Sequence, residues 1–278
     1  MSHLKRWRFW RRFFVNLFAA LGVASAIAGL VALFVGTLKA EHAWVAWPCL
    51  IFAIGFGLWR AWPRPVEAAF SAPNTTIKVV RGDLFEQDTH LVVGTCDTFD
   101  TRSPQISPRS VQGIYLSRKW RGDADGLDAA IDAHLAKLAP IDTVAKSGRT
   151  ARFELGTVVP LESHGTRDFF VAYTTMDVHN KAHGTADGLW LSLGNLWASV
   201  RRHSNGEALS IPVLGGGQSG LSPVLPAEDA IRFIALSYII AARQSPVCHE
   251  LRIVALPELY DRLNHLELQA FLSGLARA

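Results

Sequence analysis

A glycine-rich segment late in the chain has the composition of an anion-binding loop. Residues 211–220 read IPVLGGGQSG, so four glycines lie within six residues directly after an apolar run. Where side chains are missing, backbone N–H groups can approach and surround an anion, most often a phosphate. The segment lacks the Gly-Lys-Ser/Thr ending of a P-loop, and it lies too late for the dinucleotide fingerprint of a first βα turn. We therefore expect a phosphate-bearing ligand at Leu214, Gly215, Gly216, Gly217, Gln218, Ser219 and Gly220.

A second loop places a carboxylate beside a glycine. Gly82, Asp83 and Leu84 follow the apolar run at residues 77–80. A carboxylate at a strand end can accept a hydrogen bond from an exocyclic amine such as that of adenine, although Gly-Asp is also an ordinary turn.

Other reactive residue types give weaker signals. His179 and His183 are spaced i, i+4, as metal ligands on a helix can be, but no third ligand is evident in the sequence. Cys96 would need an ordered histidine partner to act as a nucleophile, and the sequence places none. We therefore predict neither a metal site nor a cofactor.

The elements that must position these loops alternate between strands and helices. Short apolar runs predict strands at residues 77–80, 91–93, 156–161, 169–174, 208–213 and 251–256. Helical periodicity predicts helices at residues 123–138, 189–200 and 226–243 and a further helix at the C-terminus. Such alternation implies an α/β sheet covered by helices on both faces, with ligands bound where the strands end.

The first 65 residues have a different composition. They hold eight Lys and Arg against one acid, which leaves 20 basic and 23 acidic residues in the remainder of the chain. The net charge is therefore +7 for residues 1–65 and −3 for residues 66–278. A negatively charged body repels phosphate backbones, so we expect no binding to nucleic acid. The apolar content is too high for a disordered chain.

Two uncharged runs in this N-terminal part predict a transmembrane helical hairpin. Residues 17–38 contain no ionisable group and would span roughly 33 Å as a helix. The first run is too long for the core of a cleaved signal peptide, and a second uncharged run follows directly at residues 43–59. The predicted organisation is a basic N-terminus (1–12), a hairpin (13–62, with helices at about 14–38 and 43–62), a linker (63–75) and a C-terminal domain (76–278).

Five cations precede the first span, so both termini should lie in the cytoplasm of a bacterium, with the hairpin in its inner membrane. Small residues recur at intervals of three and four along the first span, at Gly22, Ser25, Gly29, Ala32 and Gly36. Such a stripe lets another backbone approach closely, so it favours either self-association or packing against the second span.

Taken together, the two loops resemble those of the macro domain, an ADP-ribose-binding fold with a mixed sheet flanked by helices. Gly82 to Phe85 is similar to that family's adenine-contacting Gly-Asp motif, and residues 211–217 are similar to its late diphosphate loop. Residues 93–101 occupy the place of its first loop. The Gly-x-x-Asp-x-Phe-Asp-Thr form of that loop, behind two spans, resembles the membrane-anchored macro effectors of Thoeris anti-phage systems.

The resemblance implies both a role and a set of contacts. In that family a TIR-domain partner converts NAD into an ADP-ribose-type second messenger, which the macro domain senses before the spans damage the membrane. Carried onto this sequence, it adds ligand contacts at Asp83, Leu84, Thr95, Cys96, Asp97, Phe99, Asp100 and Thr101.

The first loop lacks the asparagines of hydrolytic macro domains, so we expect a sensor rather than an enzyme. A membrane-tethered ADP-ribosyl hydrolase, with Asp97 as a base, and a scaffold that reads ADP-ribose remain the alternatives.

Overall fold

The computed structural model describes residues 7–35, 51–57 and 65–277, apart from residues 164 and 218. The chain divides into two compact units, residues 1–64 and residues 65–278.

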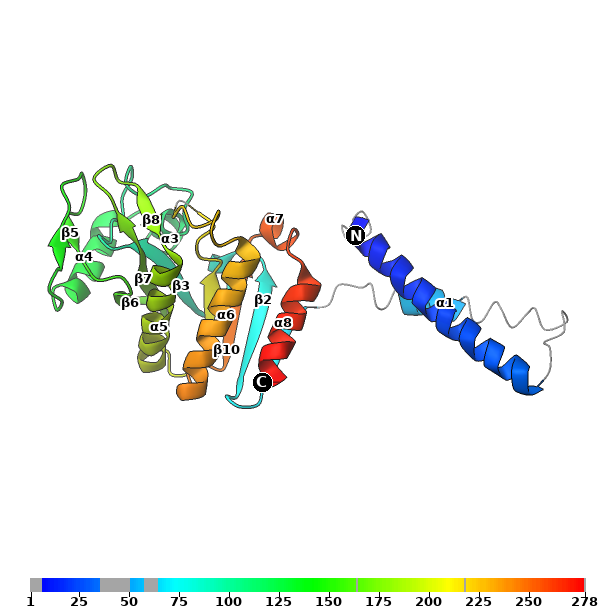
Figure 1. The fold of residues 1–278 in the computed structure, drawn as a ribbon. Helices are drawn as coiled ribbons and strands as arrows, with labels where there is room; N and C mark the ends of the chain where they lie inside the picture. The colour runs from blue at the N-terminus through cyan, green and yellow to red at the C-terminus, as the bar shows by residue number, and fades with distance from the viewer. Residues whose placement is uncertain (1–6, 36–50, 58–64, 164, 218, 278) are drawn as a thin grey trace. The chain divides into compact units, whose positions relative to one another are not determined.

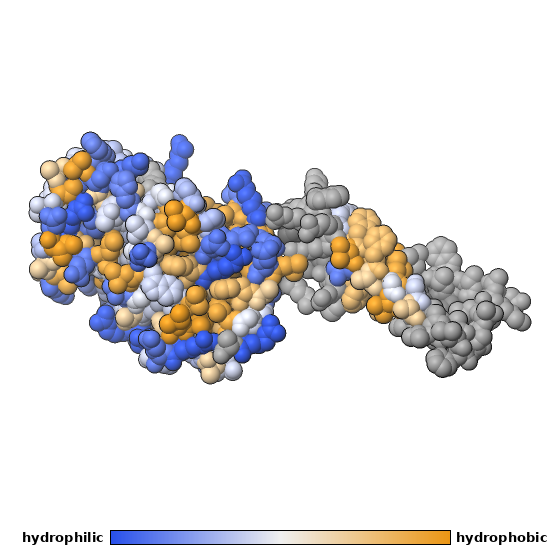
Figure 2. All heavy atoms as spheres, in the orientation of Figure 1, coloured by the Kyte–Doolittle hydropathy of each residue, from blue (hydrophilic) through white to orange (hydrophobic). Residues whose placement is uncertain are grey.

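The N-terminal unit contains one long helix, α1 (Trp7–Val35), and a helical segment at residues 51–57. The two segments are in contact, because a Cβ atom on Gly57 would lie 3.1 Å from the ring of Phe13. The remainder of the expected second span lies outside the described residues. In the described part of the chain, no helix combines the length and apolarity needed to cross a bilayer. Several apolar side chains of α1 are exposed, as Figure 2 illustrates, among them Phe14, Val15, Phe18 and Val23.

The second unit is built on a mixed sheet in the order β1-β2-β10-β9-β3-β7-β6, with β8 paired to β7 (Figure 1). Neighbouring strands from β2 to β7 are parallel, whereas β1, β6 and β8 pair antiparallel. The strands are β1 (Val66–Phe70), β2 (Thr75–Arg81), β3 (His90–Cys96), β6 (Val158–Ser163), β7 (Thr166–Met176), β8 (Ala182–Gly184), β9 (Leu209–Pro212) and β10 (Glu250–Ala255). A separate two-stranded hairpin consists of β4 (Asp142–Thr143) and β5 (Ala151–Arg152).

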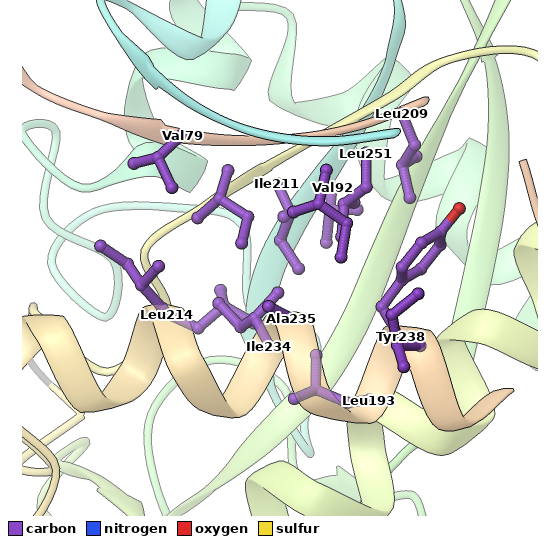
Figure 3. Packing of buried hydrophobic residues seen from close by; sticks show 14 of the residues in the cluster. Val79, Val92, Leu193, Leu209, Ile211, Leu214, Ile234, Ala235, Tyr238 and Leu251 are labelled. Atoms are coloured by element: carbon purple, nitrogen blue, oxygen red, sulfur yellow. The ribbon is translucent and has the colours of Figure 1, made fainter. Parts of the chain in front are cut away.

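Helices cover both faces of this sheet. One face carries α5 (Ala186–His203), α6 (Ala227–Gln244) and α8 (His265–Arg277), which bury the larger apolar core, part of which is drawn in Figure 3. The opposite face carries α3 (Val111–Lys119) and α4 (Ala124–Leu135), packed on strands β3, β6 and β7. The predicted α/β sheet with helices on both faces is confirmed. Two short elements, η3 (Leu84–Glu86) and α7 (Pro257–Tyr260), follow β2 and β10.

The linker expected at residues 63–75 is not one, because residues 66–70 and Thr75 belong to the sheet. Residues 66–70 form β1, whose side chains alternate between buried and exposed, and Val66 lies opposite Val79 of β2. The compact unit accordingly begins at residue 65 and not at residue 76. Val66, Ala68 and Phe70 all face the core, and their burial stabilises β1 in its position beside β2.

Helix α3 is not among the helices expected from the sequence. Its N-terminus is fixed by Ser110, whose hydroxyl accepts a hydrogen bond from the N–H of Gly113 at 3.1 Å. A Cβ at position 113 would collide with the backbone at Ser107, so glycine is required there. Helix α4 begins at a similar cap, because the Asp123 side chain accepts a hydrogen bond from the N–H of Gly126.

Candidate functional site

The loops singled out in the sequence follow parallel strands, so they meet at one edge of the sheet. Asp83 follows β2, residues 213–221 follow β9, and residues 97–101 follow β3. Strand β10 alone separates β2 from β9, and β3 is the next neighbour of β9. With about 4.8 Å between adjacent strands, Asp83 and the glycine loop begin about 10 Å apart. This edge therefore suits a ligand that carries a base at one end and phosphates in its middle.

The glycine loop consists of a base, Gly215 and Gly220, whose conformation is fixed, and a tip, Gly216 and Gly217, whose surroundings are open. Gly215 and Gly220 have φ angles of 92° and 69°, which L side chains rarely adopt. The hydroxyls of Ser219 and Ser222 both donate to the carbonyl oxygen of Gly215, at 3.2 and 2.9 Å. A Cβ on Gly217 would meet no atom within 4 Å, and one on Gly216 would meet only the carbonyl oxygen of Val213, at 3.8 Å. The tip thus leaves room for close backbone approach, as the sequence predicts. Gln218 lies outside the described residues.

Two neighbouring strands support the base of the loop. The backbone N–H of Gly184, on β8, donates to the carbonyl oxygen of Ser219 at 2.8 Å. Tyr173, on β7, lies so close to β3 that a Cβ on Gly94 would be 2.5 Å from its ring carbon Cε1. Burial raises the pKa of the Tyr173 hydroxyl, and the nearby Ser219 side chain and Gly215 backbone offset this rise in part. No sequence motif points to Tyr173 or Gly184, because only the pairing of the strands brings them close to the loop.

Both carboxylate oxygens of Asp83 have a hydrogen-bond partner within the protein. Its Oδ1 accepts from the N–H of Phe85 at 3.0 Å and caps η3, while its Oδ2 pairs with Nη1 of Arg118 at 2.7 Å. The Arg118 guanidinium lies 5.7 Å from the ring centre of Phe85. Each carboxylate oxygen has a second lone pair, so a base amine would share Asp83 with these donors. Leu84 is buried against Leu91 and Val254.

The first carboxylate of residues 94–101, Asp97, is tied to distant parts of the chain. Its side chain is 2% exposed, and its Oδ1 accepts from the N–H of Met176 at 2.8 Å. Its Oδ2 pairs with Arg152 Nη1 at 2.9 Å. Burial raises the pKa of this carboxyl, whereas the hydrogen bond from Met176 and the charge of Arg152 lower it in part. Asp97 therefore joins the loop to β7 and to the β4–β5 hairpin.

The second carboxylate, Asp100, holds a buried lysine. Its Oδ2 lies 2.6 Å from Nζ of Lys146, and the two side chains are 3% and 0% exposed. The same oxygen accepts from the Thr98 hydroxyl at 2.6 Å, and Oδ1 accepts from the N–H of Arg149 at 2.9 Å. Gly148, with a φ of 88°, passes so close to Asp100 that a Cβ there would collide with it. The hairpin turn thus closes over Asp100.

The remaining residues of this loop are also buried. Phe99 has a φ of 52° and packs edge-to-face on Phe153, and the Thr101 hydroxyl donates to Asp128 at 2.5 Å. The Cys96 thiol is buried, and desolvation raises its pKa, so a reactive thiolate is disfavoured. Thr95 differs from these residues: its hydroxyl is buried with no hydrogen-bond partner in the described part of the chain. The structure assigns most of these side chains contacts inside the protein, while their role toward a ligand stays a prediction.

A pocket of about 340 Å³ lies beside this loop but shares only Thr98 with it. Its charged lining residues are already paired, since Arg149 contacts both Asp128 at 3.1 Å and Asp132 at 2.7 Å. The pocket includes no residue of the glycine loop. We therefore place the candidate site at the strand ends and not in this pocket.

The two histidines do not lie on a helix. His179 belongs to the turn between β7 and β8, and His183 lies on β8, where its Nε2 is 2.9 Å from Asp177 Oδ2. This contact lowers the pKa of Asp177 to about 2. No group of three metal-ligating side chains occurs in the described residues.

Comparisons with known proteins identify a matching family model, a related sequence and solved structures with a similar fold. A family model described as "Thoeris protein ThsA, Macro domain" matches residues 77–255. The Thoeris protein ThsA of Bacillus amyloliquefaciens (strain Y2) is 25% identical over 152 residues, which are 52% of this chain and 50% of that protein. This chain thus aligns with only half the length of that relative.

Solved structures agree at the level of the fold. An Oceanobacillus iheyensis macrodomain with ADP superposes with a TM-score of 0.50 at 14% identity, covering 77% of this chain and 99% of that one. A mutant of a macrodomain from the same organism gives a TM-score of 0.49 at 15% identity, covering 75% and 98%. Since the family model spans more than half of the sequence, the chain belongs to the family of Thoeris ThsA macro domains.

Proposed function

We propose that the macro domain of this chain binds an ADP-ribose-type nucleotide as the sensor of an anti-phage defence system. The observation that carries the proposal is the open glycine tip at Gly216 and Gly217, which strand β10 alone separates from the Asp83 loop. Family membership supports the same ligand class, and the related macrodomain solved with ADP supports the placement of a nucleotide on this fold. The direct test is calorimetry of the purified chain with ADP-ribose, ADP and adenosine.

Sensing without turnover is the better-supported mode. Both carboxylates of the loop after β3 are buried and engaged by cations and backbone N–H groups. A general base must reach a water beside the substrate, and Asp97, at 2% exposure, does not present a free oxygen for that. Release of ADP-ribose from a modified protein by the purified chain would establish the hydrolase alternative instead.

The adenine contact at Asp83 gives a test of how the ligand is oriented. Asp83→Asn keeps an oxygen for the N–H of Phe85 but replaces the charged oxygen that pairs with Arg118. Loss of a charged acceptor typically costs about 1.5–3 kcal/mol, so affinity for ADP-ribose should fall by about 10- to 150-fold.

Calorimetry with folded variants measures this effect. Asp88→Asn serves as the control, because Asp88 also pairs with an arginine but is 89% exposed. Equal affinities of the Asp83 and Asp88 variants would remove Asp83 from the site.

The proposal extends to the membrane. Residues 17–38 and 43–59 are uncharged, α1 exposes apolar side chains, and Phe13 packs against Gly57. We propose that this unit forms a two-helix anchor in the bacterial inner membrane, and that ligand binding drives several chains together so that they disrupt the bilayer. Gly22 and Ser25 are exposed on α1 and available for such contacts. The signal would come from a TIR-domain protein that consumes NAD.

Topology tests the anchor separately from ligand binding. The five N-terminal cations predict that the C-terminus stays in the cytoplasm, so a reporter fused after Ala278 should be active only there. Deleting residues 13–62 should move the fusion from the membrane fraction to the soluble fraction. A fusion that is active in the periplasm would contradict the two-span arrangement.

A further inference from the structure

The outer surface of helices α5 and α6 carries apolar side chains that stay exposed. Trp190, Leu191 and Ile240 are 38%, 54% and 41% exposed. Trp190 packs edge-to-face on Phe233 of α6, with ring centres 4.9 Å apart, so the two helices present one joined face. Figure 2, drawn from the side on which α5 and α6 lie in front, shows hydrophobic atoms gathered over these helices. An exposed apolar patch of this kind is typical of an interaction surface.

Gly194 leaves a gap in the middle of this face. It lies near the centre of α5, on the exposed side of the helix, with Trp190 four residues before it and Ala198 four residues after it. A Cβ on Gly194 would meet no atom within 4 Å in the described structure, so nothing inside the domain requires a glycine there. Glycine also lowers the stability of a helix relative to alanine. Close approach of another backbone from outside the domain accounts for the missing side chain.

The two ends of α5 carry opposite charges. The first turn contains Asp187, and the last turn contains Arg201, Arg202 and His203. Asp187 and Arg202 are exposed, and neither has an ion-pair partner among the described residues. Asp187 and Arg201 lie seven residues before and after Gly194, or about 10 Å along the helix in each direction. A second α5 laid antiparallel across Gly194 would therefore meet opposite charge at both ends.

We propose that this face binds a second copy of the same domain, with the two α5 helices crossing antiparallel at Gly194. A two-fold axis at Gly194 brings the two backbones together where no side chain separates them. It also places Trp190 over Ala198 of the partner subunit, a large side chain against a small one, and Asp187 opposite Arg202 of the partner subunit. Each contact occurs twice, because a two-fold interface uses the same surface of both copies. This complementarity of the face with itself selects a second copy as its occupant, and the contact needs no ligand.

Disulfide trapping in the full chain tests the position of the axis. In Gly194→Cys the two introduced thiols face each other across the axis, close enough for a disulfide on mild oxidation. Gly274→Cys is the matched control, because Gly274 also lies on a helix, α8, with no atom within 4 Å of an added Cβ. Both variants keep the native cysteines, of which Cys96 and Cys248 are buried. At equal protein concentration, Gly194→Cys should give about tenfold more covalent dimer than Gly274→Cys.

Charge reversal tests the antiparallel pairing of the helix ends. In the Gly194→Cys background, Asp187→Arg and Arg202→Asp should each lower the yield of dimer by about tenfold, because each places like charges opposite one another twice. The double variant Asp187→Arg/Arg202→Asp restores opposite charges between the copies and should recover most of the yield. If these residues only complemented the dipole of their own helix, the double variant would be worse than either single one.

Equal yields from Gly194→Cys and Gly274→Cys would overturn the inference and leave the face to a partner of another kind. A double variant that yields no more dimer than the single variants would overturn the antiparallel arrangement.

Discussion

Gly217→Val should abolish binding of ADP-ribose, with a loss of affinity greater than about 100-fold, and leave the fold intact. In the free protein a Cβ at this position meets no atom within 4 Å, so the valine is accommodated without strain. The same open space is where a phosphate must approach the backbone, and the valine methyl groups would fill it. Gly216→Val should behave alike, since its nearest atom is 3.8 Å away.

Gly274→Val is the control for this experiment, because Gly274 lies on α8 with equally open surroundings. Calorimetry with ADP-ribose and a denaturation curve for each variant separate binding from stability. Wild-type affinity in both Gly216→Val and Gly217→Val would mean that the phosphates lie away from the glycine tip. Gly215 is unsuited to this test, since its φ of 92° makes any side chain disruptive.

The second large effect is expected at Asp100. Asp100→Ala leaves the fully buried ammonium of Lys146 without its carboxylate, and breaking a buried ion pair in this way costs about 3–5 kcal/mol. The N–H of Arg149 and the Thr98 hydroxyl lose the same acceptor. The loss should appear as a lower free energy of unfolding in urea.

Two further variants decide whether the buried charge is the cause. Asp125→Ala removes an ion pair with Arg102 in which the Asp125 side chain is 89% exposed, and it should cost less than about 1 kcal/mol. Adding Lys146→Met to Asp100→Ala should recover part of the loss, because it removes the unpaired charge. If Asp100→Ala proves as stable as Asp125→Ala, the pair does not hold the loop.

The sequence predicts the sheet well because each buried strand carries a local signal. Residues 77–80, 91–93 and 251–256 are apolar runs, and each lies within or overlaps β2, β3 or β10. The signal for β1 is present too, in the alternation of Val66, Ala68 and Phe70, but it is short and follows two prolines. Helix α3 escapes prediction because its start depends on contacts of Gly113 with residues 107–110.

The site is harder to predict, since its parts meet only through the fold. Sequence motifs identify the glycine loop and Asp83, where composition itself limits the chemistry. They cannot identify what surrounds Asp97 and Asp100, because Met176, Arg152 and Lys146 are 46 to 79 residues away along the chain. The residues of the Gly-x-x-Asp-x-Phe-Asp-Thr motif are therefore recognisable from the sequence. Their contacts with the β4–β5 hairpin and with β7, which hold the loop in place, can be identified only from the structure.

The antiparallel pairing of β1 determines how the domain responds to mechanical load. Val66 lies opposite Val79, so the chain enters the domain at the same edge of the sheet as Asp83. Because β1 and β2 are joined at their other ends by a turn, a pull on the preceding residues peels β1 away one hydrogen-bonded pair at a time. The side-chain amide of Gln269 accepts a hydrogen bond from the N–H of Glu67 at 2.9 Å and donates one to the carbonyl oxygen of Glu67 at 2.8 Å. These two bonds oppose the separation of the first residues of β1 from the domain. A pull on the residues before β1 would therefore separate β1 first, and the strands β2, β10 and β9, which carry the candidate site, would keep their alignment.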